Sequence, residues 1–355
     1  MKTMKCKLTA LFLILALVCL PVFVGCDETG VPGNIPTGKD TADQEMGEGT
    51  TAPEATDPEE MTAPVDPNKP DSEGLEFVSN GDGTCYVSGI GTCTDLDVVI
   101  PLVSPDGNRV TSIGDMAFFR YGLTSIIIPD SVISIGNGAF ARCSNLVSVT
   151  IPDSVTSIGI GAFELCESLT SITIPNSVTS IDVDTFRMSG LTSIVIPDSM
   201  TSIGNGAFGI SNLTSIVIPS NVTSIGDGAF ERCSDLTSIT VEEGNSVYHS
   251  DGNCLIETAS KTVIAGCKTS ILPTDGSVTK IGGAVFVNYT DLTSIVIPDS
   301  VTRIGEEAFL GCTGLTSITF EGTVDKWKAV VKGTDWNINV PATEVICSDG
   351  TVSIK

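Results

Sequence analysis

Reactive side chains are scarce in this chain of 355 residues. His249 is the only histidine, so a Ser–His–Asp or Cys–His catalytic arrangement would have to use it, and a metal site with several histidine ligands is excluded. The twelve cysteines include no CxxC pair, which removes the zinc-ribbon and thioredoxin spacings. The sequence therefore predicts no catalytic residue, no metal site and no cofactor.

Basic residues are also few, with 18 Lys and Arg against 43 Asp and Glu and a net charge of −25. Binding to nucleic acid requires clustered Lys and Arg for contacts with phosphate, so nucleic acid is not an expected partner. The same charge argues against electrostatic docking on anionic lipid. The hydrophobic fraction of 41% nevertheless leaves enough apolar residues for a substantial core.

The first residues have the pattern of an export signal. Lys2, Lys5 and Lys7 precede an uncharged run of 18 residues from Leu8 to Gly25, which predicts a signal peptide over residues 1–25. The length of the run leaves an uncleaved membrane anchor as the alternative.

Residues 22–26, VFVGC, resemble the lipobox of bacterial lipoproteins, in which the cysteine carries the lipid. The resemblance implies lipidation at Cys26, although Phe23 departs from the usual Leu, and an ordinary secretory signal is the alternative. Two acyl chains anchor a protein stably. The implied protein is exported and held at the cell membrane by its N-terminal lipid alone, facing the cell exterior.

An acidic segment follows, and residues 26–73 are predicted to be a lipidated N-terminus with a disordered tether. Residues 27–73 contain no aromatic residue, seven prolines, and thirteen Asp or Glu against two Lys, which gives a net charge of −11. Such a segment cannot bury enough apolar surface to offset its ordering entropy. We expect a spacer that holds the folded part away from a membrane.

Most of the remaining chain is one repeated unit. A phenylalanine marks each copy, with spacings of 22, 23, 23, 22, 22, 56 and 23 residues between Phe118, Phe140, Phe163, Phe186, Phe208, Phe230, Phe286 and Phe309. A period of 20–29 residues with regular apolar positions is typical of a solenoid of the leucine-rich-repeat type. One unit cannot bury its own apolar side chains, whereas stacked units can.

The segment LTSIVIPDSMTSIGNGAF, residues 191–208, shows how one unit folds. Ile194 and Ile196 alternate with Ser193 and Val195, which predicts a strand with one face inward, and Pro197 ends it. Residues 200–203 form a second short extended piece, and the Ala-Phe pair fills the interior. The sequence therefore predicts a mainly β solenoid with stacked parallel strands and little helix.

These units resemble the BspA-like leucine-rich repeats of bacterial surface proteins over about residues 110–320. The segment 82–91, DGTCYVSGIG, and the tail from Trp327 to Lys355 also resemble the entry and closing segments of that family. The resemblance implies a cell-surface or secreted protein, since several family members are adhesins. We expect an N-terminal cap over 74–109 and a C-terminal cap over 321–355, in which Thr323 or Asp325 begins a short helix, Gly333 closes it and Trp327 covers the last coil.

An irregular insert is predicted at 241–277, where two strands over 253–256 and 261–264 form a hairpin. It contains His249, Cys254 and Cys267, so a cysteine hydrolase is an alternative function, although an irregular repeat with buried thiols fits better.

Cysteines also recur three residues after the repeat phenylalanine. Ser and Tyr occupy the same position in other copies, which indicates that the position has a structural role in the stacked coils. Cys85 and Cys93 lie in the N-terminal cap of a predicted exported protein, and we expect a disulfide between them.

The outward face of the main strands is the predicted contact surface, because extended solenoid sheets serve as binding surfaces. Its positions are Ser125, Ile127, Ser148, Thr150, Ser171, Thr173, Ser193, Val195, Ser215, Val217, Ser238, Thr240, Ser294, Val296, Ser317 and Thr319. The loops beside them form a predicted rim, which consists of Phe119, Arg120, Tyr121, Arg142, Arg187, Met188, Arg232, Asn288 and Tyr289.

The resulting prediction is a non-enzymatic surface protein that binds an extracellular protein or glycan and mediates adhesion to host matrix or other cells. A passive structural spacer is the alternative, and a hydrolase that uses the insert is a further one. A row of acids after the main strands, Asp130, Asp153, Asp198 and Asp299, is interpreted as turn capping rather than as a calcium site, because the calcium-binding repeat is missing.

Overall fold

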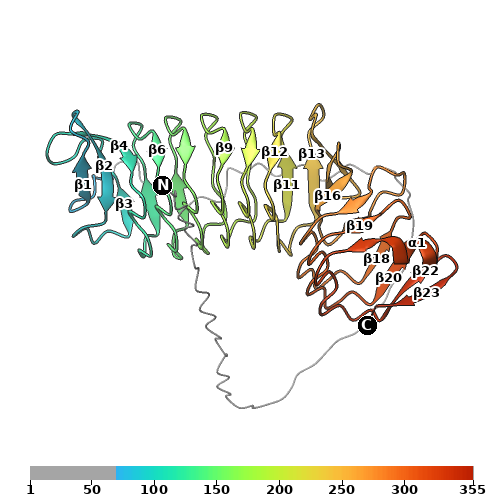
Figure 1. Cartoon of the computed structure of the whole chain (residues 1–355). Coiled ribbons are helices and arrows are strands. Elements are labelled where there is room, and N and C mark those ends of the chain that lie inside the picture. The colour runs from blue at the N-terminus through green and yellow to red at the C-terminus, as the bar shows by residue number, and fades with distance from the viewer. Residues whose placement is uncertain (1–68, 355) are drawn as a thin grey trace, which may run out of the picture. The chain divides into compact units, whose positions relative to one another are not determined.

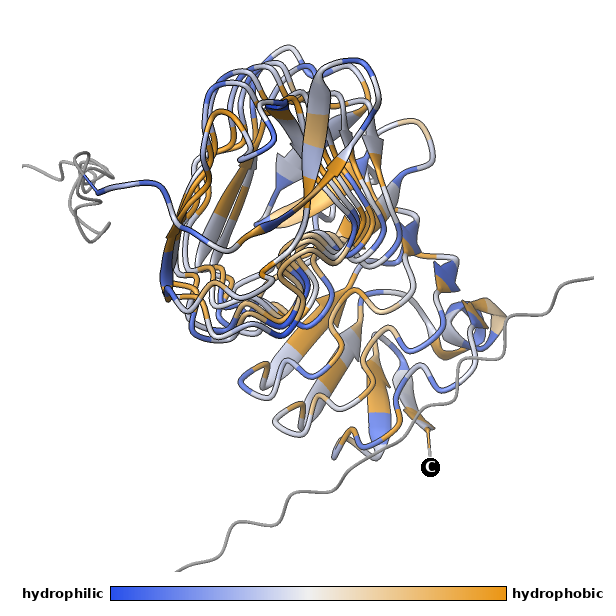
Figure 2. Cartoon of the chain, turned by 90° about the vertical axis from the view of Figure 1, so that its left-hand side faces the viewer, coloured by the Kyte–Doolittle hydropathy of each residue, from blue (hydrophilic) through white to orange (hydrophobic). Residues whose placement is uncertain are grey.

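The computed structural model describes residues 69–354, so the predicted signal peptide, Cys26 and nearly all of the acidic tether lie outside the described residues. The described chain is a mainly β solenoid in which short strands of successive coils stack in parallel (Figure 1). The predicted fold class is confirmed. In Figure 2 the coils lie one behind another, and hydrophobic residues recur at the same place in each coil.

Most coils contribute one strand to a main-strand ladder, which corresponds to the LTSIxIP segment of the repeat. Its strands are β3 (Asp97–Val99), β5 (Ser125–Ile127), β7 (Ser148–Thr150), β11 (Ser215–Ile218), β13 (Ser238–Val241), β18 (Ser294–Ile297), β20 (Ser317–Phe320) and β22 (Glu344–Cys347). Pairing is in register and parallel: Ser125 lies opposite Ser148, and Ser215 lies opposite Ser238. The isoleucines therefore stack upon one another inside the solenoid.

A second-strand ladder runs along another side of the coils and corresponds to the VTSI segment. Its regular strands are β4 (Arg109–Ile113), β6 (Ser134–Ile135), β8 (Ser157–Ile158), β9 (Ser180–Ile181), β10 (Ser202–Ile203), β12 (Ser224–Ile225), β17 (Lys280–Ile281), β19 (Arg303–Ile304) and β21 (Val331–Lys332). Most are only two residues long because glycine follows the isoleucine and turns the chain. Strands of neighbouring coils still pair in parallel, as Ser202 does with Ser180 and Ser224.

The main-strand ladder is weaker in the middle of the stack than the repeat predicts. Residues 193–196 were expected to form a strand, but that segment and the preceding main segment share only an isolated bridge between Thr173 and Val195. The coils there still register through backbone bonds such as Thr192 N–H to Thr170 O, at 3.0 Å. Strand pairing requires a matching backbone segment in the adjacent coil. The sequence of one unit therefore does not show whether its main segment forms a strand.

Stacked phenylalanines fill the interior at the turn after each second strand. The rings of Phe118, Phe140, Phe163, Phe186, Phe208 and Phe230 form one continuous column, and Phe286 with Phe309 forms another. Neighbouring ring centroids are 5.2–5.6 Å apart and the planes differ by 2–11°. The column follows from the repeat, because stacking places identical side chains at the same point of every coil.

The insert forms an antiparallel meander of β14 (Tyr248–Asp251), β15 (Cys254–Glu257) and β16 (Thr262–Ala265). The predicted hairpin is the β15–β16 pair, whereas β14 was not predicted. β16 pairs in parallel with β17, so the meander continues the second-strand ladder. Its strands separate two hydrophobic clusters: Leu255 and Ala265 pack into the cluster of the preceding coils, and Cys254, Ile256 and Val263 into that of the following coils.

Irregular elements close both ends of the stack. The first end has the hairpin of β1 (Glu76–Ser79) and β2 (Thr84–Gly89), which continues in parallel into β4. The other end has α1 (Val324–Ala329) and β23 (Gly350–Ser353), which pairs antiparallel with β22. No helix within residues 69–354 has the length and apolar character needed to span a membrane.

The C-terminal cap agrees with its prediction except at one residue. The Thr323 hydroxyl accepts from the Lys326 N–H and caps α1, and Trp327 is buried against Phe320 and Trp336. Gly333 does not close the helix: α1 already ends at Ala329 because Val330 is extended.

Candidate binding surfaces

The main-strand face consists of side chains that point away from the packed isoleucines. Strands β11 and β18 show the pattern clearly, because exposed serine and valine alternate with buried isoleucine. Most of the predicted positions are exposed, and nearly all of the others are partly covered by neighbouring coils. Exposed members are Thr150, Thr173, Ser193, Val195, Ser215, Val217, Thr240, Ser294 and Val296, and half-buried members are Ser125, Ile127, Ser171, Ser238, Ser317 and Thr319.

One predicted member of the face is wrong. Ser148 is buried, with 6% of its surface exposed, although it occupies the same repeat position as exposed Ser215. The burial pattern of β7 is shifted, because Ser148 is buried while the following Val149, whose equivalents are mostly buried, is only half-buried.

Between its end strands the face offers hydroxyl and aliphatic groups without charge, whereas exposed Asp97 of β3 and Glu344 of β22 stand at its two ends. Val195, Val217 and Val296 expose 66%, 49% and 47% of their surface. The threonines that precede the face can only accept from a ligand, because the hydroxyls of Thr192, Thr214 and others already donate to the backbone carbonyl of the preceding coil. The chemistry available to a ligand is therefore that of the outward serines, threonines and valines.

The predicted rim lies at the turn that carries the phenylalanine column. Two of its members are not available: the Tyr121 hydroxyl donates to Cys93 O at 2.9 Å, and the Tyr289 hydroxyl donates to Gly266 O at 3.0 Å. Arg120 and Arg142 are exposed, and the Arg120 guanidinium lies over the Phe119 ring. The rim therefore contributes arginines rather than tyrosines.

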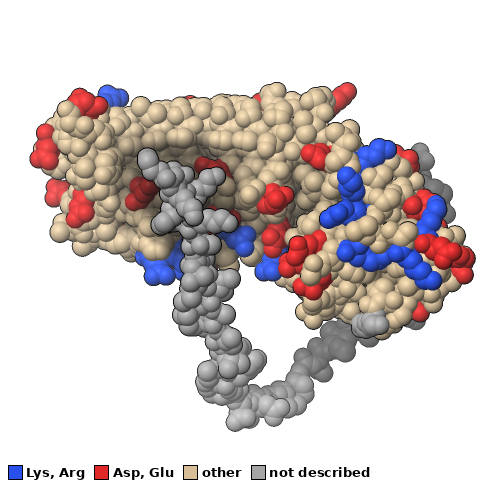
Figure 3. Space-filling model, in the orientation of Figure 1, with Lys and Arg blue, Asp and Glu red and all other residues tan. Residues whose placement is uncertain are grey.

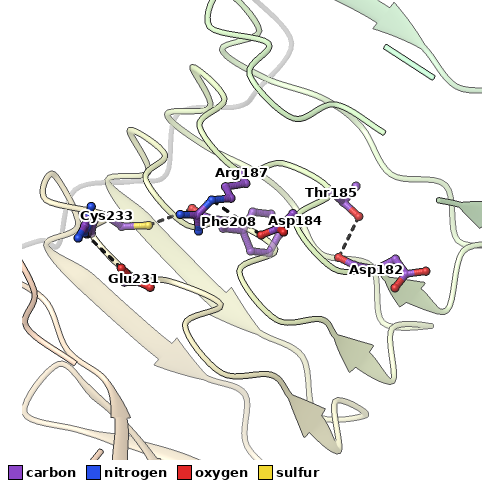
Figure 4. A network of polar contacts seen from close by, with 8 residues as sticks. Asp182, Asp184, Thr185, Arg187, Phe208, Glu231 and Cys233 are labelled. Atoms are coloured by element: carbon purple, nitrogen blue, oxygen red, sulfur yellow. Dashed lines mark hydrogen bonds and ion pairs between the residues drawn. The ribbon is translucent and has the colours of Figure 1, made fainter. Parts of the chain in front are cut away.

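Polar contacts lie along this turn in several coils (Figure 4). Arg187 Nε lies 3.9 Å from Asp184 Oδ1, and Arg232 Nε lies 3.2 Å from Glu231 Oε1. Burial raises the pKa of Glu164, and the charge of Asp184 adds to the increase. Both arginines of these pairs are partly buried. Each stands beside an acidic side chain, so this turn presents basic and acidic groups together.

The repeated cysteines are structural. The thiols of Cys143, Cys166, Cys233 and Cys312 donate to the carbonyl of a phenylalanine in the preceding coil, at 2.9–3.2 Å. Burial raises the pKa of Cys143 and of Cys312 to about 12 and also raises the pKa values of Cys166 and Cys233. A thiol that remains protonated is a poor nucleophile, which agrees with the predicted structural role.

The predicted disulfide in the N-terminal cap is not formed. Cys85 and Cys93 are both buried free thiols. The Cys85 thiol contacts Asn108 O of the adjoining segment at 3.5 Å, and Cys93 lies in the loop after β2. In the structure, Cys85 thus packs toward the neighbouring coil instead of pairing with Cys93.

The insert does not bring its histidine and thiols into a hydrogen-bonded pair. His249 Nδ1 bonds to Thr258 Oγ1 at 2.8 Å. Cys254 faces the carbonyls of Gly252 and Ile271, and burial raises its pKa to about 12. The Cys267 thiol contacts Asn253 O and Thr269 Oγ1.

The acid row after the main strands shows no metal geometry. Among residues 69–354 there is no group of three or more His, Cys, Asp or Glu side chains that could hold a metal ion. Asp299 instead pairs with Lys326 of α1 at 2.6 Å. Serines beside these acids bond to the preceding coil, as Ser154 does to Val132 O and Ser300 to Val278 O, at 2.7 Å in both cases.

The fold and repeat place this chain among known proteins. The model of the BspA type leucine rich repeat region, with 6 copies, matches residues 111–237 and 210–330, and the chain belongs to this family. A leucine rich cell surface protein from Faecalibacterium prausnitzii is similar in structure, with 26% identity, a TM-score of 0.54, and coverage of 74% of this chain and 98% of that one. A leucine-rich repeat protein from Bacteroides ovatus has 26% identity and a TM-score of 0.49, with coverage of 78% and 70%. No curated protein matches the chain significantly.

Proposed function

We propose that this protein is a non-enzymatic binding protein of the bacterial surface that attaches to an extracellular protein or glycan through its main-strand face. The observation that carries the proposal is the lack of charge along that face between its two end strands: all of its predicted positions, from Ser125 to Thr319, are Ser, Thr, Val or Ile, in a chain whose net charge is −25. Family membership supports a surface role, and the similar protein from Faecalibacterium prausnitzii is described as a cell surface protein.

The physical properties of the face suit contact with another macromolecule. Short, stiff serine, threonine and valine side chains lose little rotamer entropy when a partner covers them. Exposed Val195, Val217 and Val296 provide apolar area, and the nearby serine hydroxyls donate and accept hydrogen bonds. Acidic side chains elsewhere on the protein keep it soluble. A partner that covers this face therefore does not have to remove water from charged groups.

The test is a binding screen of the full chain against matrix proteins, glycans and neighbouring cells. For each hit we compare Val195→Glu/Val217→Glu with a matched control, Ser157→Glu/Ser180→Glu, which adds the same charge to two exposed positions of the second-strand ladder. The first variant should lose binding and the control should retain it. Equal loss in both would place the contact elsewhere, and no hit in any class would favour a passive spacer.

We further propose that Cys26 carries a lipid that holds the protein at the membrane. Support comes from the VFVGC sequence and the preceding apolar run. Palmitate labelling of cells that express the wild type or Cys26→Ala tests the anchor, and loss of label with release of the variant is expected. Equal labelling of both would show that Cys26 is not the lipid site.

A further inference from the structure

The second-strand ladder changes its outward chemistry near the C-terminal end of the stack. In the earlier coils its outward position is a serine: Ser134, Ser157, Ser180, Ser202 and Ser224. The strands β17 and β19 carry Lys280 and Arg303 at the same position, and both side chains are exposed. The register pairs Lys280 directly with Arg303 across adjacent parallel strands.

A third cation extends this row. Thr262 of β16 lies opposite Lys280, and exposed Lys261 immediately precedes Thr262. We call Lys261, Lys280 and Arg303, on or next to three consecutive strands, the basic row. Figure 3 shows lysine and arginine side chains gathered over the C-terminal coils, with acidic side chains among them, whereas much of the earlier stack is free of lysine and arginine on this face.

Within the described part of the chain, the basic row lacks acidic partners. The three ion pairs found within residues 69–354 involve Arg187, Arg232 and Lys326, and none involves the basic row. The Lys261 ammonium donates to Gly276 O, a neutral carbonyl, at 2.9 Å. The glutamates of the following turn, at 306 and 307, are therefore not ion-pair partners of Arg303 in the described structure.

Folding does not explain why Lys280 and Arg303 stand side by side. Adjacent parallel strands are about 4.8 Å apart, and like charges directly opposite one another destabilise a sheet. Serine at the same position in the earlier coils shows that the fold does not need a cation there. An external anion would remove the repulsion between Lys280 and Arg303 and provide the missing partner.

The form of the surface indicates the kind of anion. The row lies on an exposed ladder, so it suits an extended ligand with repeated anionic groups. Thr279 and Thr302 precede the two cations, and the Thr302 hydroxyl donates back to Thr279 O, which leaves its lone pairs free to accept hydrogen bonds. We propose that the basic row binds an acidic polysaccharide, through its sulfate or carboxylate groups, with the threonines contacting sugar hydroxyls.

This proposal goes beyond the proposed function, because it concerns a different ladder and a specified class of ligand. If the main-strand face bound no ligand, the proposal for the basic row would still stand. The acidic composition of the whole chain favours a short contact over a long one, since an anionic polymer is repelled by the surrounding surface.

The experiment measures binding of the full chain to immobilised heparin and polygalacturonate, with uncharged dextran and polyglutamate as further surfaces. Lys280→Ser/Arg303→Ser restores the residue of the earlier coils. It should weaken binding to heparin or polygalacturonate by about tenfold or more and reduce its dependence on salt. The control Arg109→Ser/Lys328→Ser removes two exposed cations that belong neither to the basic row nor to the rim, and it should bind as the wild type does.

Thermal unfolding confirms that each variant is folded before its affinity is compared. Failure of the wild type to bind either acidic polysaccharide would overturn the proposal, as would equal weakening in the control. Binding to polyglutamate that matches heparin and is lost in the same variant would assign the row to acidic peptides instead.

Discussion

At the scale of single residues, one departure from the repeat has a clear physical cause. Side-chain oxygens at the turn accept backbone N–H groups of the next coil: Asp115 Oδ1 from Asn137 at 2.7 Å, and Asn137 Oδ1 from Ile160 at 2.9 Å. Ile160 has no side-chain oxygen and cannot accept from Val183. Asp182, which stands where neighbouring coils have glycine, accepts from the Val183 N–H at 2.8 Å instead. Asp182 thus compensates for Ile160.

This interpretation predicts coupling between the two residues. Asp182→Gly should lower the free energy of unfolding by about 1 kcal/mol, because the Val183 N–H loses its acceptor. In an Ile160→Asn background the same change should cost less, since the introduced asparagine would accept from Val183 as Asn137 accepts from Ile160. Urea unfolding of the four proteins gives the coupling energy. Strictly additive effects would contradict the compensation.

The buried thiols predict how stability varies at alkaline pH. Cys143, Cys254 and Cys312 have pKa values raised to about 12 from the ordinary value of 9.0. Below about pH 9 both the folded and unfolded chains keep these protons, so the full stability is present. Between about pH 9 and 12 the unfolded chain releases them first, and the free energy of unfolding falls.

We expect a loss on the order of 1–2 kcal/mol per thiol between pH 8 and about pH 10.5. Cys143→Ser/Cys312→Ser keeps two hydroxyl donors but removes two titrating groups, so its stability should fall less over this range. Urea unfolding under reducing conditions at the two pH values measures the difference. An equal fall in wild type and variant would show that these thiols do not control the alkaline response.

At the scale of the repeated element, the distance between coils depends on the glycine after each second strand. A Cβ at Gly136 would lie 2.6 Å from the Asp115 backbone nitrogen, and one at Gly204 would lie 2.6 Å from the Asp182 carbonyl carbon. These contacts are with backbone atoms, which cannot move without separating the coils. The glycine of the IGxGAF segment is therefore required by close approach of neighbouring coils.

Gly136→Ala should accordingly reduce the free energy of unfolding by about 1–3 kcal/mol or more. Gly122→Ala is the matched control, because its Cβ would meet only the Asn145 side chain, at 3.9 Å. The control should be neutral or slightly stabilising, since alanine restricts the unfolded chain. Thermal unfolding of both variants makes the comparison, and equal melting temperatures would contradict the close-contact argument.

The repeat predicts much of the element but not its interactions with neighbours. The spacing of Ile and Pro predicts most of the main strands, although residues 193–196 form only a bridge, and the Ala-Phe pair predicts the phenylalanine column. Burial of Ser148, the loosened ladder at Thr173 and Val195, and the Tyr121 bond to Cys93 O all depend on an adjacent coil about 22 residues or more away. The sequence does not indicate β14, because Tyr-His-Ser-Asp has no alternating apolar pattern. The basic row was visible as Lys280 and Arg303 in serine positions, but only the register shows that they are adjacent.

At the scale of the whole described chain, the insert divides the hydrophobic interior into two clusters. The meander contributes Leu255 to the first cluster and Ile256 to the second, so successive residues of β15 pack on opposite faces of the meander. In a solenoid each coil is stabilised mainly by its neighbours. The stability of each cluster is therefore determined by its own coils, and they are coupled through the two-sided strands β15 and β16.

This division predicts separate unfolding when one cluster is weakened. Both tryptophans of the chain, Trp327 and Trp336, lie in the second cluster, so their fluorescence reports on that cluster alone, whereas far-UV circular dichroism reports on all coils. Phe309→Ala removes a ring that stacks on Phe286 and contacts Trp336, a loss of about 3–5 kcal/mol. The fluorescence transition in urea should then precede most of the dichroism change.

Phe163→Ala weakens the first cluster instead, and most of the dichroism change should then precede the fluorescence transition. The reason is that the tryptophans keep their own packed coils while the earlier stack unfolds. Coincident fluorescence and dichroism transitions in both variants would contradict this prediction. They would mean that the meander couples the two clusters into one unit that unfolds cooperatively.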